Sequence, residues 1–147
     1  MKRLSIIAVF ALTLISSAFA NKTTTPDFKG IKNFNKSFPE ATEVTYKVVE
    51  KYTEVSFTWH NMQLQAFYDN DGNLFATTRH IEIKDLPVSY LINIRKEFAG
   101  FILTEAIEFD QTDTGLSYYV TVADAQKTYV LKITTDGTIA VFKKMKN

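Results

Sequence analysis

The chain has 147 residues and no cysteine, and this absence excludes several kinds of site at once. Disulfide bonds, thiolate metal ligands, a cysteine nucleophile and a lipidated N-terminal cysteine are all ruled out. Glycine is also scarce, with five residues, and no glycine-rich phosphate loop, nucleophile elbow or Ser/His/Asp arrangement is present. The fold must therefore be stabilised by the packing of its side chains.

The sequence lacks the excess of basic residues that nucleic-acid binding requires. It has 17 basic and 16 acidic side chains, and two of the basic ones lie within the first 20 residues, so the rest of the chain carries 15 against 16, a net charge of −1. Lysines cluster only at Lys143, Lys144 and Lys146, where a solvated C-terminal tail is the simpler explanation. This balance argues against a nucleic-acid partner.

Beyond residue 20 the chain has no apolar run long enough to cross a membrane. Residues 1–20 themselves combine a basic start, an apolar run at residues 4–15 and a small-x-small site at residues 18–20, which is the pattern of a cleaved signal peptide. An uncleaved N-terminal anchor is the alternative. The pattern predicts a periplasmic or secreted protein that starts at Asn21 and has no membrane anchor in its mature form.

Two segments, residues 63–76 and residues 127–142, follow the same plan. Each has an alternating apolar and polar run, an Asp-Gly pair and an alternating return, which predicts a β-hairpin. Gly72 and Gly137 lie 65 positions apart, and at this offset the apolar positions coincide: Leu64 with Tyr129, Ala66 with Leu131, Tyr68 with Ile133 and Leu74 with Ile139. We expect a duplicated unit in which both glycines take the same turn position.

Each hairpin is preceded by a helical stripe and two alternating strands. The first stripe should begin at Asp27 as N-cap and end at Pro39, and the second should begin with Asp85 before Pro87 and end at Gly100. The apolar residues of the two stripes recur at intervals of three and four: Phe28, Ile31, Phe34, Phe38, then Val88, Leu91, Ile94, Phe98. The strands are expected at residues 44–48, 55–59, 74–81, 101–109 and 116–122 and in the two hairpins, with a polar loop at residues 110–115.

This order predicts an α+β fold, a tandem repeat of one helix plus a four-stranded antiparallel meander. The two repeats, at about residues 27–82 and 85–147, would form a curved eight-stranded sheet with two helices on one face. Residues 21–26 are polar and are expected to form a flexible N-terminus. A unit of about 60 residues is marginal alone, so the repeats should share one core within a single domain, residues 27–147.

Four motifs in this order resemble the PepSY-like, β-lactamase-inhibitor-like family of exported bacterial proteins. They are Phe38-Pro39-x-Ala41-x-x-Val44-x-Tyr46, Ala66-Phe67-Tyr68-Asp69-x-Asp71-Gly72, Leu86-Pro87 and Ile133-Thr134-Thr135-Asp136-Gly137. The resemblance implies the tandem fold of the β-lactamase inhibitor protein and no established catalytic residues. That inhibitor is disulfide-bonded and this chain has no cysteine, so inhibition of β-lactamase does not follow from the resemblance.

Candidate metal and catalytic sites are few. A calcium loop starting at Asp69 would need glycine at Leu74 and glutamate at His80, so a tight turn explains residues 69–73 better. His60, His80 and Glu82 could supply zinc ligands, but a site needs three or four that converge. The carboxylates of Asp110 and Asp113 fall in the polar loop, where exposure to solvent does not favour a catalytic role. We therefore predict no enzyme activity, no cofactor and no metal.

The positive signal lies on the sheet face opposite the helices. We expect one apolar set to face the helices: Val55, Phe57, Leu64, Ala66, Val120, Val122, Leu131 and Ile139. The alternation of side chains along each strand then directs a second set to the other side of the sheet: Gln63, Gln65, Phe67, Phe75, Tyr119, Lys132 and Phe142. Aromatic rings among Gln and Lys are typical of a protein-binding patch. Single aromatics that rest against loops are the alternative.

Our leading hypothesis is an exported, non-enzymatic binding module. It would present the open sheet face to an unidentified envelope or secreted protein or peptide, and inhibition is one form that such binding could take. The alternative is a periplasmic carrier of a small apolar or glycan ligand, held by the curved sheet. An enzyme is the least supported class.

Overall fold

The computed structural model describes residues 28–146. The helical segments in this part of the chain are α1 (Ile31–Ser37), the 3₁₀ turn η1 (Ile83–Asp85) and α2 (Val88–Glu97). The strands are β1 (Thr42–Val49), β2 (Tyr52–Trp59), β3 (Met62–Asp69), β4 (Leu74–Ile81), β5 (Ile102–Gln111), β6 (Gly115–Ala123), β7 (Lys127–Thr134) and β8 (Ile139–Lys146). The predicted signal peptide, the start at Asn21, the flexible residues 21–26 and the Asp27 cap lie outside the described residues.

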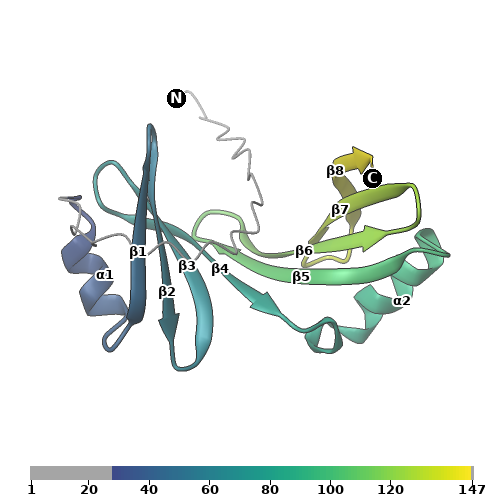
Figure 1. The fold of residues 1–147 in the computed structure, drawn as a ribbon, viewed down its shortest axis with the longest axis horizontal. Helices are drawn as coiled ribbons and strands as arrows, with labels where there is room; N and C mark the ends of the chain where they lie inside the picture. Colours follow the sequence, from purple (N-terminus) through teal and green to yellow (C-terminus); the bar gives the residue numbers. More distant parts are fainter. Residues whose placement is uncertain (1–27, 147) are drawn as a thin grey trace.

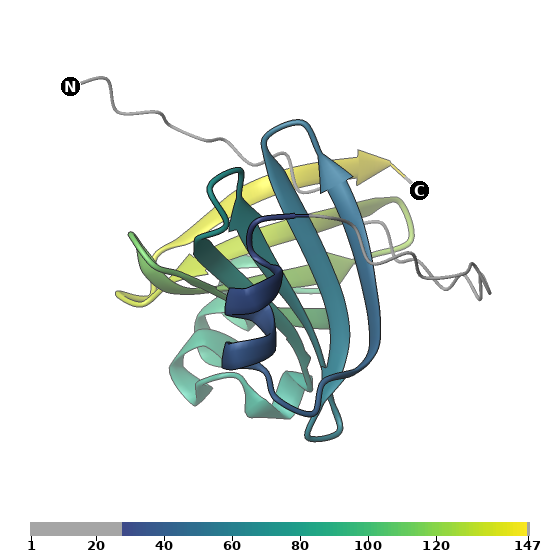
Figure 2. The ribbon, with the colours of Figure 1, turned by 90° about the vertical axis from the view of Figure 1, so that its left-hand side faces the viewer.

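The eight strands form one antiparallel sheet in the order of the sequence, from β1 to β8. The sheet bends between its two halves, and both helices lie on the outer, convex side of the bend (Figure 1). Figure 2, viewed from the side of α1, shows this helix lying across the strands of the first unit. The structure therefore confirms the predicted α+β architecture and leaves a concave face opposite the helices.

The convex face holds two clusters of buried side chains, one under each helix. Phe34 of α1 packs edge-on against Phe57, and Ile94 of α2 is fully buried over the second half of the sheet. Every residue of the predicted helix-facing set belongs to one of these clusters or packs against it: Val55, Phe57, Leu64, Ala66, Val120, Val122, Leu131, Ile139. The alternation of the strands thus assigned the core face correctly.

The two hairpin turns are built in the same way. Asp69 N–H bonds to the Asn73 carbonyl and Gly72 N–H to the Asp69 carbonyl, and the same two bonds recur 65 positions later at Thr134 and Gly137. Both glycines have positive φ, +85° and +83°, a backbone conformation that glycine adopts without steric cost. The predicted shared turn position of the two glycines is confirmed.

The helix starts and one loop differ from the sequence prediction. Helix α2 begins after Pro87 with no side-chain cap, and Asp85 closes the 3₁₀ turn instead of capping the helix. The expected polar loop at residues 110–115 is shorter, because β5 extends through Gln111 and pairs it with Gly115. Polar composition predicted a loop here, but the cross-strand ladder of a long hairpin continues through these polar residues.

A charged pair joins the two repeats on the convex face. Arg79 of β4 lies opposite Glu108 of β5 and donates from Nε to Oε1 at 2.6 Å and from Nη2 to Oε2 at 3.1 Å. The Glu108 side chain is largely buried, and its hydrogen bond to Arg79 raises the pKa of the guanidinium. Two parallel bonds fix the register of the strands where the repeats meet.

Candidate functional site

The concave face carries the residues that alternation sent away from the helices, and its centre is a third buried cluster. Phe67, Ala76 and Phe109 form this cluster, with Tyr52, Phe75 and Tyr119 packed at its edge. Its three residues come from β3, β4 and β5, so the cluster joins side chains of both repeats. Figure 1 shows the sheet bending in the region of these strands. The concave face therefore has an apolar floor as well as exposed groups.

Phe67 is the main correction to the predicted site. It lies on the predicted face, but only 2% of its surface is exposed, and its ring is 6.0 Å from Tyr52 and 6.2 Å from Phe75 between ring centroids. The expectation of an exposed Phe67 that anchors a partner is wrong. Strand alternation gives the face of a side chain, but it contains no information on how far the sheet bends over that face.

The second repeat supplies the accessible aromatic end of the concave face. Tyr119 of β6 meets Phe142 of β8 edge-on at 5.1 Å and Phe109 at 5.9 Å between centroids. Lys132 of β7 places Nζ 5.9 Å from the centre of the Tyr119 ring, within the range of a cation–π contact. Burial raises the pKa of the Tyr119 hydroxyl, and Phe142 remains 36% exposed. Tyr119, Lys132 and Phe142 are thus brought together as predicted.

The first repeat supplies a polar end. Gln65 donates from Nε2 to Glu54 Oε1 at 2.9 Å and accepts from the Thr78 hydroxyl at 3.1 Å. These bonds hold the amide in one orientation, so that Gln65 is a fixed part of the surface. Gln63, two residues earlier, is exposed, and Phe75 is half-buried beside the central cluster. The predicted residues therefore form two ends of one face, polar and aromatic, and do not form one continuous patch.

Sequence reasoning missed a polar group between these ends. His80 of β4 lies beside Glu105 of β5, with Nδ1 3.4 Å from Oε1, and the Thr121 hydroxyl donates to the other oxygen of Glu105 at 3.3 Å. The sequence suggested Glu82 as the neighbour of His80, but Glu82 pairs with Lys84 beyond the end of the strand. The missing information was the β4–β5 register, which places Ala106 opposite Ile81 and so brings Glu105 near His80.

The residues considered for metal binding do not converge. Within residues 28–146, no three His, Cys, Asp or Glu side chains come together in a way that could hold a metal ion. Asp69 accepts hydrogen bonds from the backbone of Asp71 and Asn73 inside its own turn, and these bonds lower the pKa of its carboxyl. The turn explanation of residues 69–73 is therefore confirmed.

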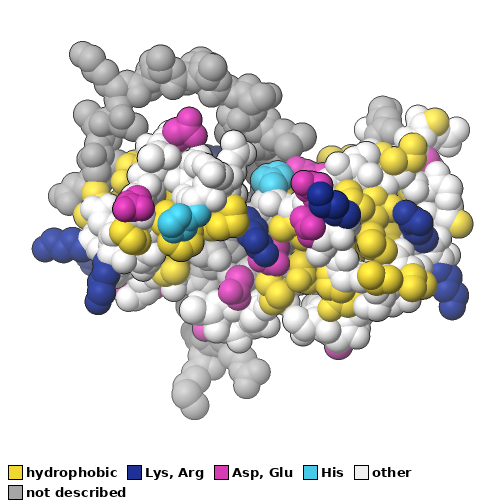
Figure 3. Space-filling model, turned by 90° about the horizontal axis from the view of Figure 1, so that it is seen from below, with side chains coloured by type: hydrophobic (Ala, Val, Ile, Leu, Met, Phe, Trp, Pro, Cys, Tyr) yellow, Lys and Arg dark blue, Asp and Glu magenta, His cyan; other side chains and the backbone are white. Residues whose placement is uncertain are grey.

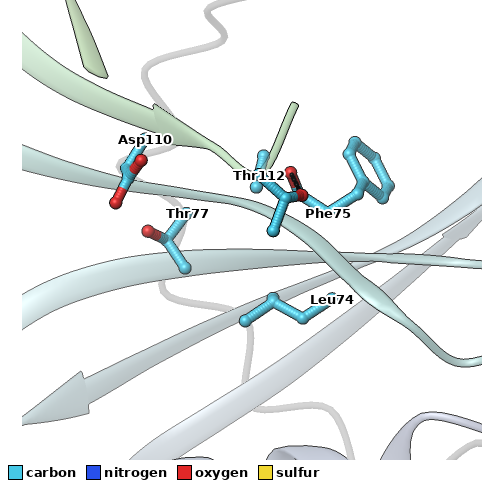
Figure 4. Close-up of a pocket in the computed structure, with 6 residues that line it drawn as sticks. Leu74, Phe75, Thr77, Asp110 and Thr112 are labelled. Carbon is cyan, nitrogen blue, oxygen red and sulfur yellow. Dashed lines mark hydrogen bonds between the residues drawn. The ribbon is translucent and has the colours of Figure 1, made fainter. Parts of the chain in front are cut away.

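A small pocket lies near the junction of the repeats, where β4 begins and β5 ends. It is lined by Leu74, Phe75, Ala76, Thr77, Asp110 and Thr112, and Figure 4 shows the Phe75 ring directed away from Leu74. Its volume of ≈ 90 Å³ is well below the roughly 300–1,000 Å³ that is usual for small-molecule sites. This pocket gives no support to the small-ligand carrier.

Hydrophobic side chains also reach the surface on the side of α2 (Figure 3). Val88 and Ile92, one turn apart on α2, are 71% and 60% exposed. Neither helix in the described part of the chain has the length and apolar character needed to span a bilayer. These two residues provide an exposed apolar surface against which the concave face can be compared.

The solved structures that share this fold include several from Bacteroides species. A BLIP-like protein from Bacteroides fragilis has a TM-score of 0.71 and 17% identity, over 83% of this chain and 89% of that chain. A DUF2874 family protein from Bacteroides ovatus has a TM-score of 0.72 and 15% identity, over 83% of this chain and 88% of that chain. A structure from Bacteroides eggerthii, described as that of an inferred periplasmic protein, has a TM-score of 0.72 and 13% identity. The match covers 82% of this chain and 88% of that chain.

Identities this low establish the fold alone, so the chain is BLIP-like in architecture. The inhibitor-like part of the predicted resemblance is confirmed at the level of fold, but none of these three structures is described as a PepSY protein. No protein-family model and no curated protein matches the chain.

Proposed function

We propose that this protein is an exported, non-enzymatic binding module whose concave face binds another protein or a peptide. The observation that carries the proposal is the accessible aromatic end of that face, where Tyr119, Phe142 and Lys132 gather beside a buried apolar floor. Aromatic side chains are enriched at protein interfaces, and tyrosine is among the residues that contribute most to affinity there.

The arrangement of this face supports binding by a preorganised surface. The Tyr119 ring is fixed between Phe109 and Phe142, and Gln65 is held by Glu54 and Thr78. Side chains that are already ordered lose little conformational entropy when a partner arrives, so more of the contact energy appears as affinity. A periplasmic or secreted location belongs to the proposal and is supported by the signal-like residues 1–20 and by the inferred periplasmic neighbour.

Affinity capture from the envelope of the source organism tests the proposal. Wild-type protein is compared with a Tyr119→Ala, Phe142→Ala double variant and with Ile92→Ala, which truncates an apolar residue that is more exposed than Phe142 and lies on the opposite face. We expect the double variant to lose the captured protein and Ile92→Ala to retain it.

Titration with the purified captured protein then measures how much binding free energy the double variant loses. The double variant should lose about 2 kcal/mol or more of binding free energy if these rings are hot spots. A partner that binds the double variant normally and is lost with Ile92→Ala would contradict the concave face as the site. Capture of no protein, together with a small molecule in mass spectra of the purified chain, would favour the carrier.

A further inference from the structure

Strand β8 forms one outer edge of the sheet. It pairs with β7 along one side, and no strand of residues 28–146 pairs with its other side. Six of its eight residues are exposed. The outer side of an edge strand presents unpaired N–H and C=O groups, which can accept a further strand.

The edge is strongly basic. Lys143, Lys144 and Lys146 are exposed, and none of them forms an ion pair with any residue of the described part of the chain. Strand β8 contains no acidic residue, and the neighbouring strand adds Lys127 and Lys132. The positive charge along β8 is therefore not neutralised within its hairpin strands.

The lysines occupy both faces of the edge. Lys143 lies opposite Val130, on the concave side, whereas Lys144 lies opposite Tyr129, which packs in the cluster under α2. The pairing is continuous from Lys143 to Lys146, after a shift of register between Val141 and Lys143. An added strand would thus meet lysine side chains on both of its own faces along this stretch.

The opposite edge of the sheet differs in charge. Strand β1 carries both Glu43 and Lys47, and its pairing with β2 is interrupted between Thr42 and Thr45. Each edge contains one such irregularity, between Thr42 and Thr45 in β1 and between Val141 and Lys143 in β8, so the charge is what distinguishes them. The basic character is therefore specific to β8.

We propose that the β8 edge binds an extended acidic peptide segment by strand addition, with the backbone of Lys143 to Lys146 supplying hydrogen bonds and the lysines selecting acidic side chains. Edge lysines also keep identical edges apart, because pairing of β8 with β8 would bring lysines from both copies together. The same charge that opposes a second copy favours a strand of opposite charge. This site uses the outward backbone groups of residues 143–146, whereas the concave site uses the side chains of Tyr119, Lys132 and Phe142, and the two adjoin where Phe142 precedes Lys143 on β8.

Hydrogen–deuterium exchange of residues 139–146 tests the proposal with synthetic peptides of about eight residues, a usual strand length. The probe alternates Glu and Thr. One control peptide has the same sequence with alternate backbone nitrogens methylated, which keeps the charge but removes donors of the ladder, and another has Lys in place of Glu. At low salt we expect the acidic peptide alone to slow exchange in β8, by about tenfold or more when the site is saturated.

Variants of the full chain separate charge at the edge from charge elsewhere. Replacing Lys143, Lys144 and Lys146 together by Gln should weaken binding of the acidic peptide about tenfold, the expected sum of three exposed ion pairs. A matched triple variant changes three exposed helix lysines to Gln and should bind as wild type: Lys32→Gln, Lys36→Gln and Lys96→Gln.

Four results would overturn the proposal. They are equal binding by the methylated peptide, equal weakening by the helix variant, no protection of β8 at low salt, and a dimer in sedimentation whose β8 is protected without peptide. The last result would make a second copy the occupant. Tyr119→Ala should bind the acidic peptide normally, so that failure of the concave-face proposal and failure of this one are distinguishable.

Discussion

The hydroxyl of Tyr68 offers a sharp test of the packing under α1. Tyr68 is fully buried, and no group of residues 28–146 forms a hydrogen bond with its Oη. Its ring lies 5.5 Å from Phe28 and 6.5 Å from Phe34 between centroids, and a Cβ on Gly30 would come within 2.9 Å of its Cδ1. The ring is closely packed, while the polar atom has lost its hydration without compensation.

Tyr68→Phe should therefore stabilise the protein at pH 7. The substitution keeps the ring and removes the hydroxyl, whose unsatisfied burial costs about 1–3 kcal/mol. For a domain of this size each kcal/mol raises Tm by about 4 °C. Urea unfolding followed by the fluorescence of the single tryptophan, Trp59, measures the change, because this residue packs in the same cluster.

The difference in stability between Tyr68→Phe and wild type should grow as the pH is raised above about 10. Burial, and then the neighbouring Tyr46, raise the pKa of Tyr68 to about 12, whereas an unfolded tyrosine has a pKa of about 10. Since the folded state holds its proton more tightly, this contribution to stability is complete below pH 10 and is lost as the pH rises from about 10 to 12. The loss amounts to about 2.7 kcal/mol in wild type and is absent from Tyr68→Phe.

Tyr90→Phe is the matched control, with the opposite sign. The Tyr90 hydroxyl donates to the Thr135 carbonyl at 3.0 Å and ties α2 to the β7–β8 turn, so its removal should cost about 0.5–1.5 kcal/mol. If Tyr68→Phe is less stable than wild type at pH 7, its hydroxyl has a bonding partner. If the difference from wild type stays constant up to pH 12, the burial argument for the raised pKa is refuted.

Further substitutions test the backbone and the core. Glu40 has a φ of +67° where the second repeat has Gly100 at +88°, so Glu40→Gly should stabilise by about 1 kcal/mol and Gly100→Ala should destabilise by a similar amount in urea titrations. Gly72→Ala should lower the free energy of unfolding by at least about 1 kcal/mol more than Gly137→Ala. A Cβ at Gly72 would lie 2.7 Å from the backbone of residues 29 and 30, whereas the nearest atom to a Cβ at Gly137 is 3.7 Å away. Equal Tm values for the two variants would contradict this. Phe67→Ala should lower the free energy of unfolding by about 3–5 kcal/mol, because the side chain is buried. A loss below about 1 kcal/mol would indicate that the Phe67 side chain is exposed after all.

The fold could be predicted from the sequence because two local signals agreed. The alternation of the strands assigned the core face, and the repeated Asp-Gly turns fixed the hairpins, so that Leu74–Ile81 was predicted with its observed bounds. Helix starts were predicted less well, because Asp85 has the right residue type for a cap but belongs to a 3₁₀ turn. Capping preferences are local, and the tertiary path of the chain into α2 overrides them.

The candidate site could be predicted only in part. The alternation of side chains along each strand placed Tyr119, Lys132 and Phe142 on one face, and in the structure they lie together. Two facts depend on contacts between segments far apart in sequence, namely the burial of Phe67 at the bend and the meeting of His80 with Glu105. No pattern within a single strand contains the curvature or the β4–β5 register, so neither fact could be obtained from periodicity.

Comparison of the two repeats within the chain shows which face can vary at little cost to folding. At the offset of 65, positions under the helices remain apolar: Leu64 and Tyr129, Ala66 and Leu131, Tyr68 and Ile133. Two positions on the concave face change their chemical class: Gln65 corresponds to Val130, and Phe67 to Lys132. Packing under a helix demands an apolar side chain in both repeats, because a polar group buried there without a partner is costly. At the position of Phe67 the second repeat is free of that requirement, because Lys132 stands there beside Tyr119, which contacts Phe142. A binding surface can therefore be built at this end without disturbing the packing that holds the fold, which is why we assign the partner to the second repeat.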